Sequence, residues 1–163
     1  MFKFIHTADI HLDSPLRGLP EYPGAPVEVE EIRKASREAF DRLVSLAIEE
    51  KVQLVLIAGD LYDSSAPTAD AQQLVVQALL ALRDTGAKVL AIAGNHDSAA
   101  TFDAYRPLLD AVDITLVGRV RPAARGGVVS FDARSTGERV NVAVLPFLSQ
   151  RYAVRAAQLV AST

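Results

Sequence analysis

The sequence predicts an α/β fold in which buried strands alternate with amphipathic helices. Two runs rich in branched apolar residues, 52–58 and 89–93, each end at a glycine. Such runs are typical of strands in a parallel sheet that has helices on either side. Between them, apolar residues recur every three or four positions over 69–84, which indicates a helix. The 163 residues suffice for one domain with a substantial core.

The first part of the chain supplies the opening elements of this pattern. Residues 3–7 form a short apolar-rich run that predicts a strand. Residues 15–26 contain four prolines and two glycines, which exclude a regular helix or a central strand. Helical periodicity then predicts a long amphipathic helix over 27–50. Its inward-facing residues are expected to be Ile32, Ala35, Ala39, Leu43, Leu46 and Ala47.

The later elements follow from the same reasoning. The helix at 69–84 is expected to turn Leu74, Ala78 and Leu82 inward. Residues 98–110 predict a short helix that Pro107 perturbs. Beyond it, the turns are rich in Gly, Arg and Ser and predict an antiparallel second sheet. Its strands are expected at 114–117, 127–131 and 140–145, before a weakly helical tail at 151–161.

Composition excludes several classes of protein. The chain has no cysteine, which rules out a disulfide scaffold, a cysteine nucleophile and a thiolate zinc site. No apolar run approaches the roughly 18 residues of a membrane span, and His6 and Asp9 interrupt the N-terminus too early for a signal peptide. A cytoplasmic chain without membrane contact is therefore expected. With a net charge of −3, it would hold nucleic acid through metal ions or a partner.

Each of the first three predicted strands runs into a polar cluster. The clusters are Asp9-x-His11, Gly59-Asp60-x-x-Asp63 and Gly94-Asn95-His96-Asp97. Ligands of open α/β sheets bind at the carboxyl ends of the strands, so the three clusters are expected to meet at one edge. Carboxylate, imidazole and amide groups suit divalent ions such as Mn²⁺, Fe²⁺ or Zn²⁺. The glycines allow the sharp exit that turns the next residue toward that edge.

In this order the clusters resemble the motifs of calcineurin-like metallophosphoesterases. The stretches FIHTADIHLDSPLRGL and LVLIAGDLYD narrow the resemblance to the DNA-repair exonuclease group that contains the D subunit of the SbcCD nuclease, and LDSPLRGL to its YhaO-like branch. The resemblance covers about residues 3–110. It implies a β-sandwich flanked by helices, with four layers in the order αββα. Residues 1–163 would form the N-terminal part of this domain, without its C-terminal part or the capping domain.

The resemblance also implies which residues bind metal. Asp9 and His11 would bind the first of two divalent ions, Asp60 would bridge both ions, and Asn95 would bind the second. The implied metal is Mn²⁺, with Fe²⁺ and Zn²⁺ as alternatives. The two ions would hold a hydroxide for in-line attack and neutralise charge on the phosphoryl oxygens.

Three further residues receive roles from the resemblance. His96 would donate a proton or stabilise the transition state beside the scissile phosphate. Asp63 and Asp97 would support the ligands or lie near the leaving group, although an acidic Asp63 argues against proton delivery from a position where some members carry histidine. The three additional histidines of the family are missing, because no histidine follows His96. These residues alone are therefore expected to be weakly active or inactive.

The function implied for the intact protein is Mn²⁺-dependent cleavage of DNA phosphodiesters in DNA repair, as an exonuclease or endonuclease. An ATPase partner of the SbcC type would supply the basic DNA-binding surface. Two alternatives remain open: a phosphodiesterase or phosphatase for small phosphoesters, and a non-catalytic interaction module. An incomplete sandwich leaves apolar sheet surface uncovered, so a homodimer is a further expectation.

The remaining polar residues are assigned structural roles. Asp13 is predicted to cap a helix or form an Asx turn, and His6 to lie in the core or at its rim. Three arginines are expected in a solvated turn: Arg119, Arg121 and Arg125. The chain has no glycine-rich phosphate loop followed by lysine and no G-x-S-x-G turn, which excludes a P-loop nucleotidase and a serine hydrolase.

Overall fold

The computed structural model describes residues 1–14 and 29–149. The predictions for 15–26, for the side chain of Ile32 and for the tail at 151–161 lie outside the described residues. None of the helices in the described ranges is long and apolar enough to cross a membrane. The elements in chain order are β1 (Phe4–Thr7), α1 (Val29–Glu49), β2 (Leu54–Ala58), α2 (Ala69–Asp84), β3 (Lys88–Ile92), α3 (Ala99–Asp110), β4 (Ile114–Val117), a 3₁₀ turn (Ala123–Arg125), β5 (Val128–Asp132) and β6 (Arg139–Ala143).

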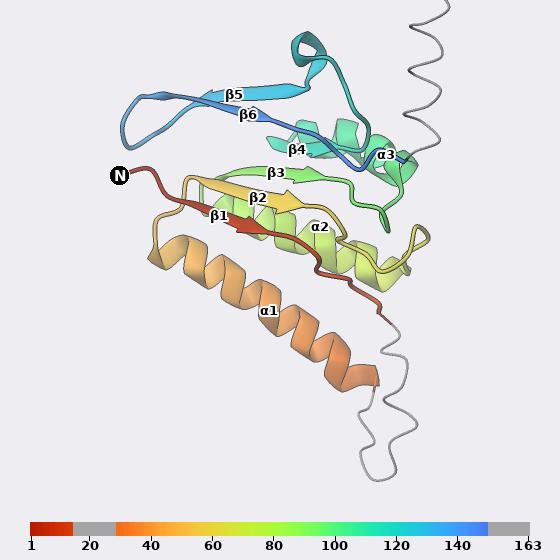
Figure 1. Cartoon of the computed structure of the whole chain (residues 1–163). Helices are drawn as coiled ribbons and strands as arrows, with labels where there is room; N and C mark the ends of the chain where they lie inside the picture. The colour runs from red at the N-terminus through yellow and green to blue at the C-terminus, as the bar shows by residue number, and fades with distance from the viewer. Residues whose placement is uncertain (15–28, 150–163) are drawn as a thin grey trace, which may run out of the picture.

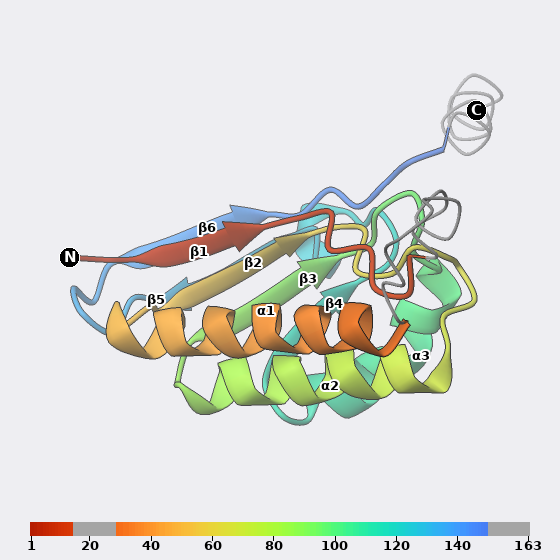
Figure 2. The same cartoon turned by 90° about the horizontal axis from the view of Figure 1, so that it is seen from below.

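Strands β1 to β4 form one parallel sheet in the order β1-β2-β3-β4. Thr7 at the end of β1 pairs with Ile57 near the end of β2, so the carboxyl ends of these strands are level. Helices α1 and α2 lie side by side on one face of the sheet (Figures 1 and 2). The predicted strands are confirmed to within two residues, and the predicted bounds of α2 are confirmed. Of its expected inward residues, Ala78 and Leu82 are buried and Leu74 is partly buried.

The prediction that residues 114–117 belong to an antiparallel second sheet is wrong. Strand β4 lies parallel to β3, with Val117 opposite Ile92, and α3 is the crossover helix between the two strands. The 12 residues of α3 provide such a crossover even with Pro107 inside the helix. Three of the four residues of β4 are buried, as expected for a strand covered on both faces.

The second face of the parallel sheet is covered by a β-hairpin. Strands β5 and β6 pair antiparallel, as predicted, on the side opposite α1 and α2 (Figure 1). Leu90 and Val117 of the parallel sheet pack with Val144, which follows β6. The predicted α/β class with a parallel sheet flanked by helices is confirmed, and the hairpin covers the face opposite α1 and α2. The described residues supply three layers, helical, parallel and antiparallel, in the order expected for an αββα sandwich.

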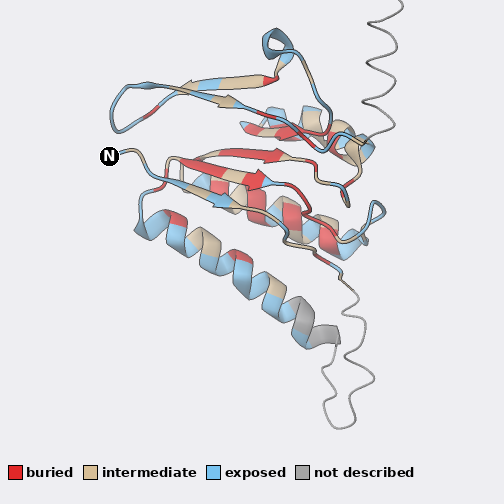
Figure 3. Ribbon diagram, viewed as in Figure 1, coloured by how far each residue is buried: buried red, intermediate tan, exposed pale blue. Residues whose placement is uncertain are grey.

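The core-facing side of helix α1 agrees only in part with the periodicity, which correctly selected Ala47 and the partly buried Leu43. Phe40 and Ala47 are buried, whereas Leu46 is 45% exposed and Ala35 and Ala39 are exposed. Figure 3 shows short buried stretches along a mostly exposed α1. An aromatic ring buries far more apolar area than an alanine. Phe40, which lies outside the predicted set, is therefore the largest buried side chain that α1 contributes to the core.

Candidate metal centre

The segments that follow β1 and β2 run side by side at the carboxyl edge of the sheet. The backbone amide of Asp9 donates to the carbonyl oxygen of Gly59 at 3.1 Å, and that of His11 donates to the carbonyl oxygen of Asp60 at 3.0 Å. The turns that follow β1, β2 and β3 gather at this end of the sheet (Figure 2). The pairing of β1 and β2 thus continues past the strands and brings the first two predicted clusters together.

Three of the predicted metal ligands have a left-handed backbone conformation. The φ angles of Asp9, His11 and Asp60 are +54°, +48° and +51°. Residues other than glycine rarely adopt this conformation, and each such residue stores about 1–3 kcal/mol. Strained residues of this kind concentrate at functional sites, where the surrounding structure holds them in place. Their grouping here marks this edge as the candidate site.

Gly59 and Gly94 allow the turns after β2 and β3 to approach closely. Gly59 has a φ of +100°, and a Cβ atom on it would lie 2.8 Å from the Cα atom of Gly94. A Cβ atom on Gly94 would lie 2.1 Å from Oδ1 of Asp60. Neither position has room for a side chain. The Asp60 carboxylate therefore occupies space that exists only because residue 94 is glycine.

The side chains of Asp9, His11 and Asp60 form a group that fits a metal ion. Nε2 of His11 lies 3.9 Å from Oδ1 of Asp9 and 3.8 Å from Oδ2 of Asp60. The ligand atoms of all three residues lie within 4.8 Å of one another. Oxygen and nitrogen atoms bound to one ion at about 2.0–2.2 Å lie at most about 4.4 Å apart, so the separations of 3.9 and 3.8 Å from Nε2 of His11 fit a shared ion. Asp60 is only 6% exposed, which strengthens its attraction for a cation.

Asp63 contacts both histidines of this edge. Its Oδ1 atom lies 3.1 Å from Nδ1 of His11, and its backbone carbonyl oxygen lies 2.9 Å from Nδ1 of His96. Carboxylate and carbonyl oxygens only accept hydrogen bonds, so Nδ1 of each ring carries the proton. The Nε2 atoms are thereby left for a metal ion or a substrate. The G-D-x-x-D motif identified Asp63 as a candidate, but not that one residue would orient two rings.

His96 lies beside His11 with its ring nearly perpendicular. The ring centroids are 4.9 Å apart at an angle of 80°. The hydrogen bond to the carbonyl oxygen of Asp63 raises the pKa of His96 above its ordinary value; burial opposes this effect, and the nearby carboxylates of Asp60, Asp63 and Asp97 add to it. A raised pKa favours the protonated ring, which a proton donor requires.

Asp97 holds the turns after β2 and β3 together. Its carboxylate, in a residue that is 9% exposed, accepts hydrogen bonds from the backbone amides of Gly94 at 2.8 Å, Tyr62 at 3.1 Å and Leu61 at 3.3 Å. Helix α3 is instead capped by Ser98. The Asp97 carboxylate thus links two turns by hydrogen bonds. No feature of the sequence reveals this link.

Three further polar residues were assigned roles from the sequence. Asn95 is exposed on the turn that also carries His96, and its side chain makes no hydrogen bond within the described residues. His6 is exposed on the edge strand β1, so the prediction that it lies in the core or at its rim is wrong. Asp13 accepts a hydrogen bond at 3.1 Å from the backbone amide of Thr68, the N-cap of α2, in line with its predicted structural role. The predicted histidines and aspartates whose ligand atoms lie together are Asp9, His11, Asp60, Asp63 and His96.

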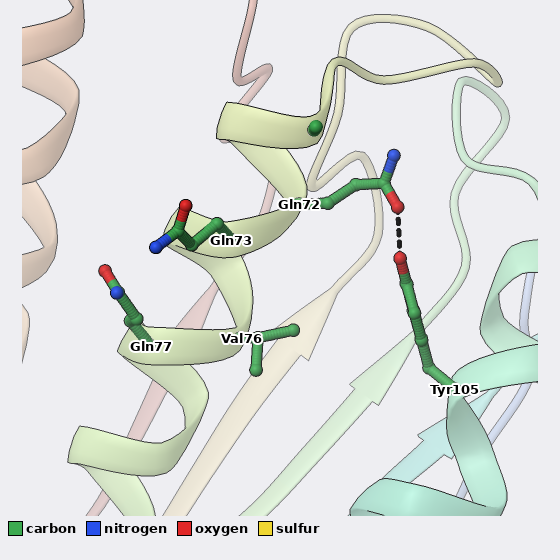
Figure 4. Close-up of a pocket in the computed structure, with 6 residues that line it drawn as sticks. Gln72, Gln73, Val76, Gln77 and Tyr105 are labelled. Atoms are coloured by element: carbon green, nitrogen blue, oxygen red, sulfur yellow. Dashed lines mark hydrogen bonds between the residues drawn. The ribbon is translucent and has the colours of Figure 1, made fainter.

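A groove lies between α2 and α3, but its lining residues are poor candidates for hydrolytic chemistry. Gln72 accepts a hydrogen bond from the hydroxyl of Tyr105 across this groove (Figure 4). The groove contains no carboxylate and no imidazole, so it offers neither a metal ligand nor a general base for hydrolysis. Its lining residues are Ala69, Gln72, Gln73, Val76, Gln77 and Tyr105.

Comparison with known proteins finds several relatives by sequence. The chain is 36% identical over 94 residues to the uncharacterized metallophosphoesterase YhaO of Bacillus subtilis, an alignment covering 58% of this chain and 22% of YhaO. It is 34% identical over 148 residues to the DNA double-strand break repair protein Mre11 of Aeropyrum pernix, covering 90% of this chain and 33% of that protein. The D subunit of the SbcCD nuclease of Bacillus subtilis is 30% identical over 149 residues, which cover 91% of this chain and 34% of that protein.

The family can be stated more firmly than the relatives' individual activities. This chain spans only about a third or less of the length of these three proteins. The model of the calcineurin-like phosphoesterase family, however, matches residues 2–142, which include all the clusters described above. The parallel sheet and its helices agree with the fold of that family. The chain therefore belongs to the calcineurin-like phosphoesterase family.

Proposed function

We propose that this edge of the sheet is a two-metal phosphoesterase centre and that the whole protein uses it to cleave phosphodiesters of DNA in DNA repair. The observation that carries the proposal is the cluster of Asp9, His11 and Asp60 beside a histidine, His96, whose Nε2 atom is free. Relatives named as a nuclease subunit and as a DNA double-strand break repair protein support DNA as the substrate.

The proposed ligands divide between two ions. Asp9 and His11 would hold the first ion, Asp60 would contribute to both, and Asn95, exposed on its turn, would bind the second. The group is proposed to take Mn²⁺, and its oxygen and nitrogen donors also suit Fe²⁺ or Zn²⁺. When bound, such ions acidify water and neutralise charge on phosphoryl oxygens.

The protein's own contribution is positioning and proton transfer. Asp63 holds His11 in the tautomer that leaves Nε2 free, and its backbone carbonyl oxygen orients His96 in the same way. The protonated form of His96, favoured by its raised pKa, would donate a proton to the leaving oxygen or stabilise charge on the phosphate. Asp97 fixes the turn that carries His96.

Further proposals concern the whole protein rather than these residues. We propose that residues 1–163 are the N-terminal part of a longer phosphoesterase domain and are weakly active or inactive alone, because the family's three later histidines are not among them. We also propose a cytoplasmic location, an ATPase partner of the SbcC type that supplies basic surface, and a homodimer. The N-terminal position and the ATPase partner rest on the family resemblance, whereas the homodimer rests on the apolar sheet surface that an incomplete sandwich would leave uncovered.

The test is hydrolysis by the full-length protein with Mn²⁺, measured on linear duplex DNA and on bis-p-nitrophenyl phosphate. We expect DNA cleavage that falls by about 10²-fold or more in His96→Ala, because that variant loses the proton donor. Turnover of the small ester without DNA cleavage would favour the alternative of a small-molecule phosphodiesterase. Unchanged DNA cleavage in His96→Ala would contradict the catalytic role of this edge.

Mn²⁺ titration by calorimetry separates binding from turnover. The 163-residue chain should bind Mn²⁺, and Asp60→Ala should abolish the binding because Asp60 contributes to both proposed ions. Asp132→Ala, which removes an exposed carboxylate of the hairpin, is the control and should titrate like the unsubstituted chain.

A further inference from the structure

Three arginine side chains surround one carboxylate beside the last strand of the parallel sheet. Oδ1 of Asp103, on α3, lies 3.5 Å from Nη1 of Arg106 and 3.3 Å from Nη2 of Arg121. Its Oδ2 lies 3.4 Å from Nε of Arg119. The sequence places Arg119 and Arg121 in a solvated turn, so their convergence on α3 is visible only in the folded chain. We call Arg106, Arg119 and Arg121 the arginine cluster.

The arginine cluster lies at the same edge of the sheet as the metal centre. Val117 at the end of β4 pairs with Ile92 at the end of β3, so the segment carrying Arg119 leaves the sheet beside the turn carrying His96. Gly118 packs against the first turn of α3, where a Cβ atom would lie 2.7 Å from the carbonyl oxygen of Ala99. At about 1.5 Å per helical residue, Asp103 lies only about 8 Å along α3 from its N-cap.

The charges of the cluster do not balance. Three guanidinium groups face one carboxylate, which leaves two positive charges in a chain whose net charge is −3. Each guanidinium carries five N–H donors, far more than one carboxylate can accept. The separations of 3.3–3.5 Å are also longer than those of tight charge-assisted hydrogen bonds. Donors are therefore left for a second anion.

The cluster is both accessible and partly preorganised. The side chain of Arg119 is 65% exposed, while that of Arg121 is 26% exposed. Arg121 runs along the turn at Gly126, where a Cβ atom would lie 3.9 Å from its side chain. A guanidinium fork held in this way matches the geometry of phosphate oxygens, which favour bidentate contacts with arginine.

We propose that the arginine cluster binds the phosphodiester backbone of the DNA strand whose scissile phosphate lies at the metal centre. It would bind the strand a few nucleotides from the cleavage position and position it across the edge of the sheet. This inference rests on the proposed function and adds to it a strand-binding subsite made by the chain itself. Phosphate contacts of this kind give affinity and position without reading sequence.

The test is fluorescence anisotropy of labelled DNA in EDTA, so that the metal centre takes no part. We expect Arg119→Gln/Arg121→Gln to bind about tenfold more weakly and to lower the slope of log K against log salt by about 1–2. The control, Arg139→Gln, removes an exposed arginine of β6 that pairs with Asp132, and it should bind like the unsubstituted chain. Asp103→Asn should bind DNA more tightly at low salt, because it removes the competing carboxylate.

Two results would overturn the inference: unchanged binding in the double variant, or no DNA binding by the unsubstituted chain. A purely structural cluster predicts a lower melting temperature in the variants with no change in salt slope, which also overturns it. Mn²⁺ titration of the same variants keeps the two proposals separate. Intact Mn²⁺ binding with arginine-independent DNA binding defeats only the strand-binding subsite. Arginine-dependent DNA binding by a chain that binds no Mn²⁺ defeats only the proposed metal centre.

Discussion

The two ends of the parallel sheet both carry charged residues, but only one end neutralises them. At the amino end, Lys3 pairs with Glu50, and Lys88 at the start of β3 pairs with Asp113 just before β4. The side chain of Gln53, before β2, bonds to both the hydroxyl and the backbone amide of Ser135. This end is an ordinary protein surface in which opposite charges meet.

Around the candidate metal centre at the carboxyl end, negative charge gathers instead. Asp9, Asp60 and Asp63 surround His11, and within the described ranges no lysine or arginine pairs with any of these carboxylates. Like charges held close together destabilise a fold unless a counter-charge is present. The difference between the two ends shows where the fold accepts an energetic cost, and a bound cation would relieve it.

Among the substitutions that test this difference, loss of the Asp97 carboxylate should have the largest effect on stability. Asp97→Ala leaves two buried backbone amides and one partly buried one without their acceptor, so we expect the free energy of unfolding to fall by about 3–5 kcal/mol. Urea denaturation measures the change, with Asp132→Ala as an exposed control that should change stability by less than about 1 kcal/mol. Equal losses in the two variants would mean that the carboxyl end has no special architecture.

Gly94→Ala should have the next largest effect. The added Cβ atom would lie 2.1 Å from Oδ1 of Asp60 and 2.4 Å from its backbone nitrogen, so the turn must shift. Overpacking of this kind costs about 1–3 kcal/mol. Mn²⁺ affinity should fall as well, because Asp60 moves. Gly137→Ala offers the comparison with a glycine that has open space around it and only a φ of +71° to oppose substitution. Mn²⁺ binding retained in Gly94→Ala would separate the turn from the metal centre.

Asp60→Asn should test the electrostatic difference between the two ends. The amide keeps an acceptor for the backbone amide of His96 but removes a negative charge, so stability without metal should be unchanged or slightly higher. Mn²⁺ affinity should fall by about tenfold or more, and with it the rise in melting temperature on adding Mn²⁺. Thermal melts with Mn²⁺ and with EDTA measure both effects. A lower melting temperature in EDTA alone would mean that Asp60 is a structural residue.

Features that follow from local sequence patterns could be predicted, whereas features that depend on contacts between residues far apart in the sequence could not. The three clusters were predictable because branched apolar runs ending at Gly59 and Gly94 reveal buried strands, and residues after strand ends share an edge. The pairing of β4 was not, since four residues after a proline-containing helix fit either sheet. The contacts of Asp97 with two turns, and those of Asp103 with Arg121, join residues that only tertiary packing brings together.

The smallest effect is expected at the amino end, from Glu50→Gln. The hydrogen bond and charge of Lys3 lower the pKa of Glu50, so the pair contributes stability above the unfolded-state pKa and loses it as the pH falls through the lower folded-state value. The pair is exposed, so at pH 7 the melting temperature should fall by at most about 1–2 °C. The difference should disappear in acid, where both proteins carry an uncharged residue 50, and shrink in about 1 M salt. A fall in melting temperature at pH 7 as large as that of Gly94→Ala would contradict this expectation. It would show that charge pairing stabilises the amino end as strongly as packing stabilises the carboxyl end.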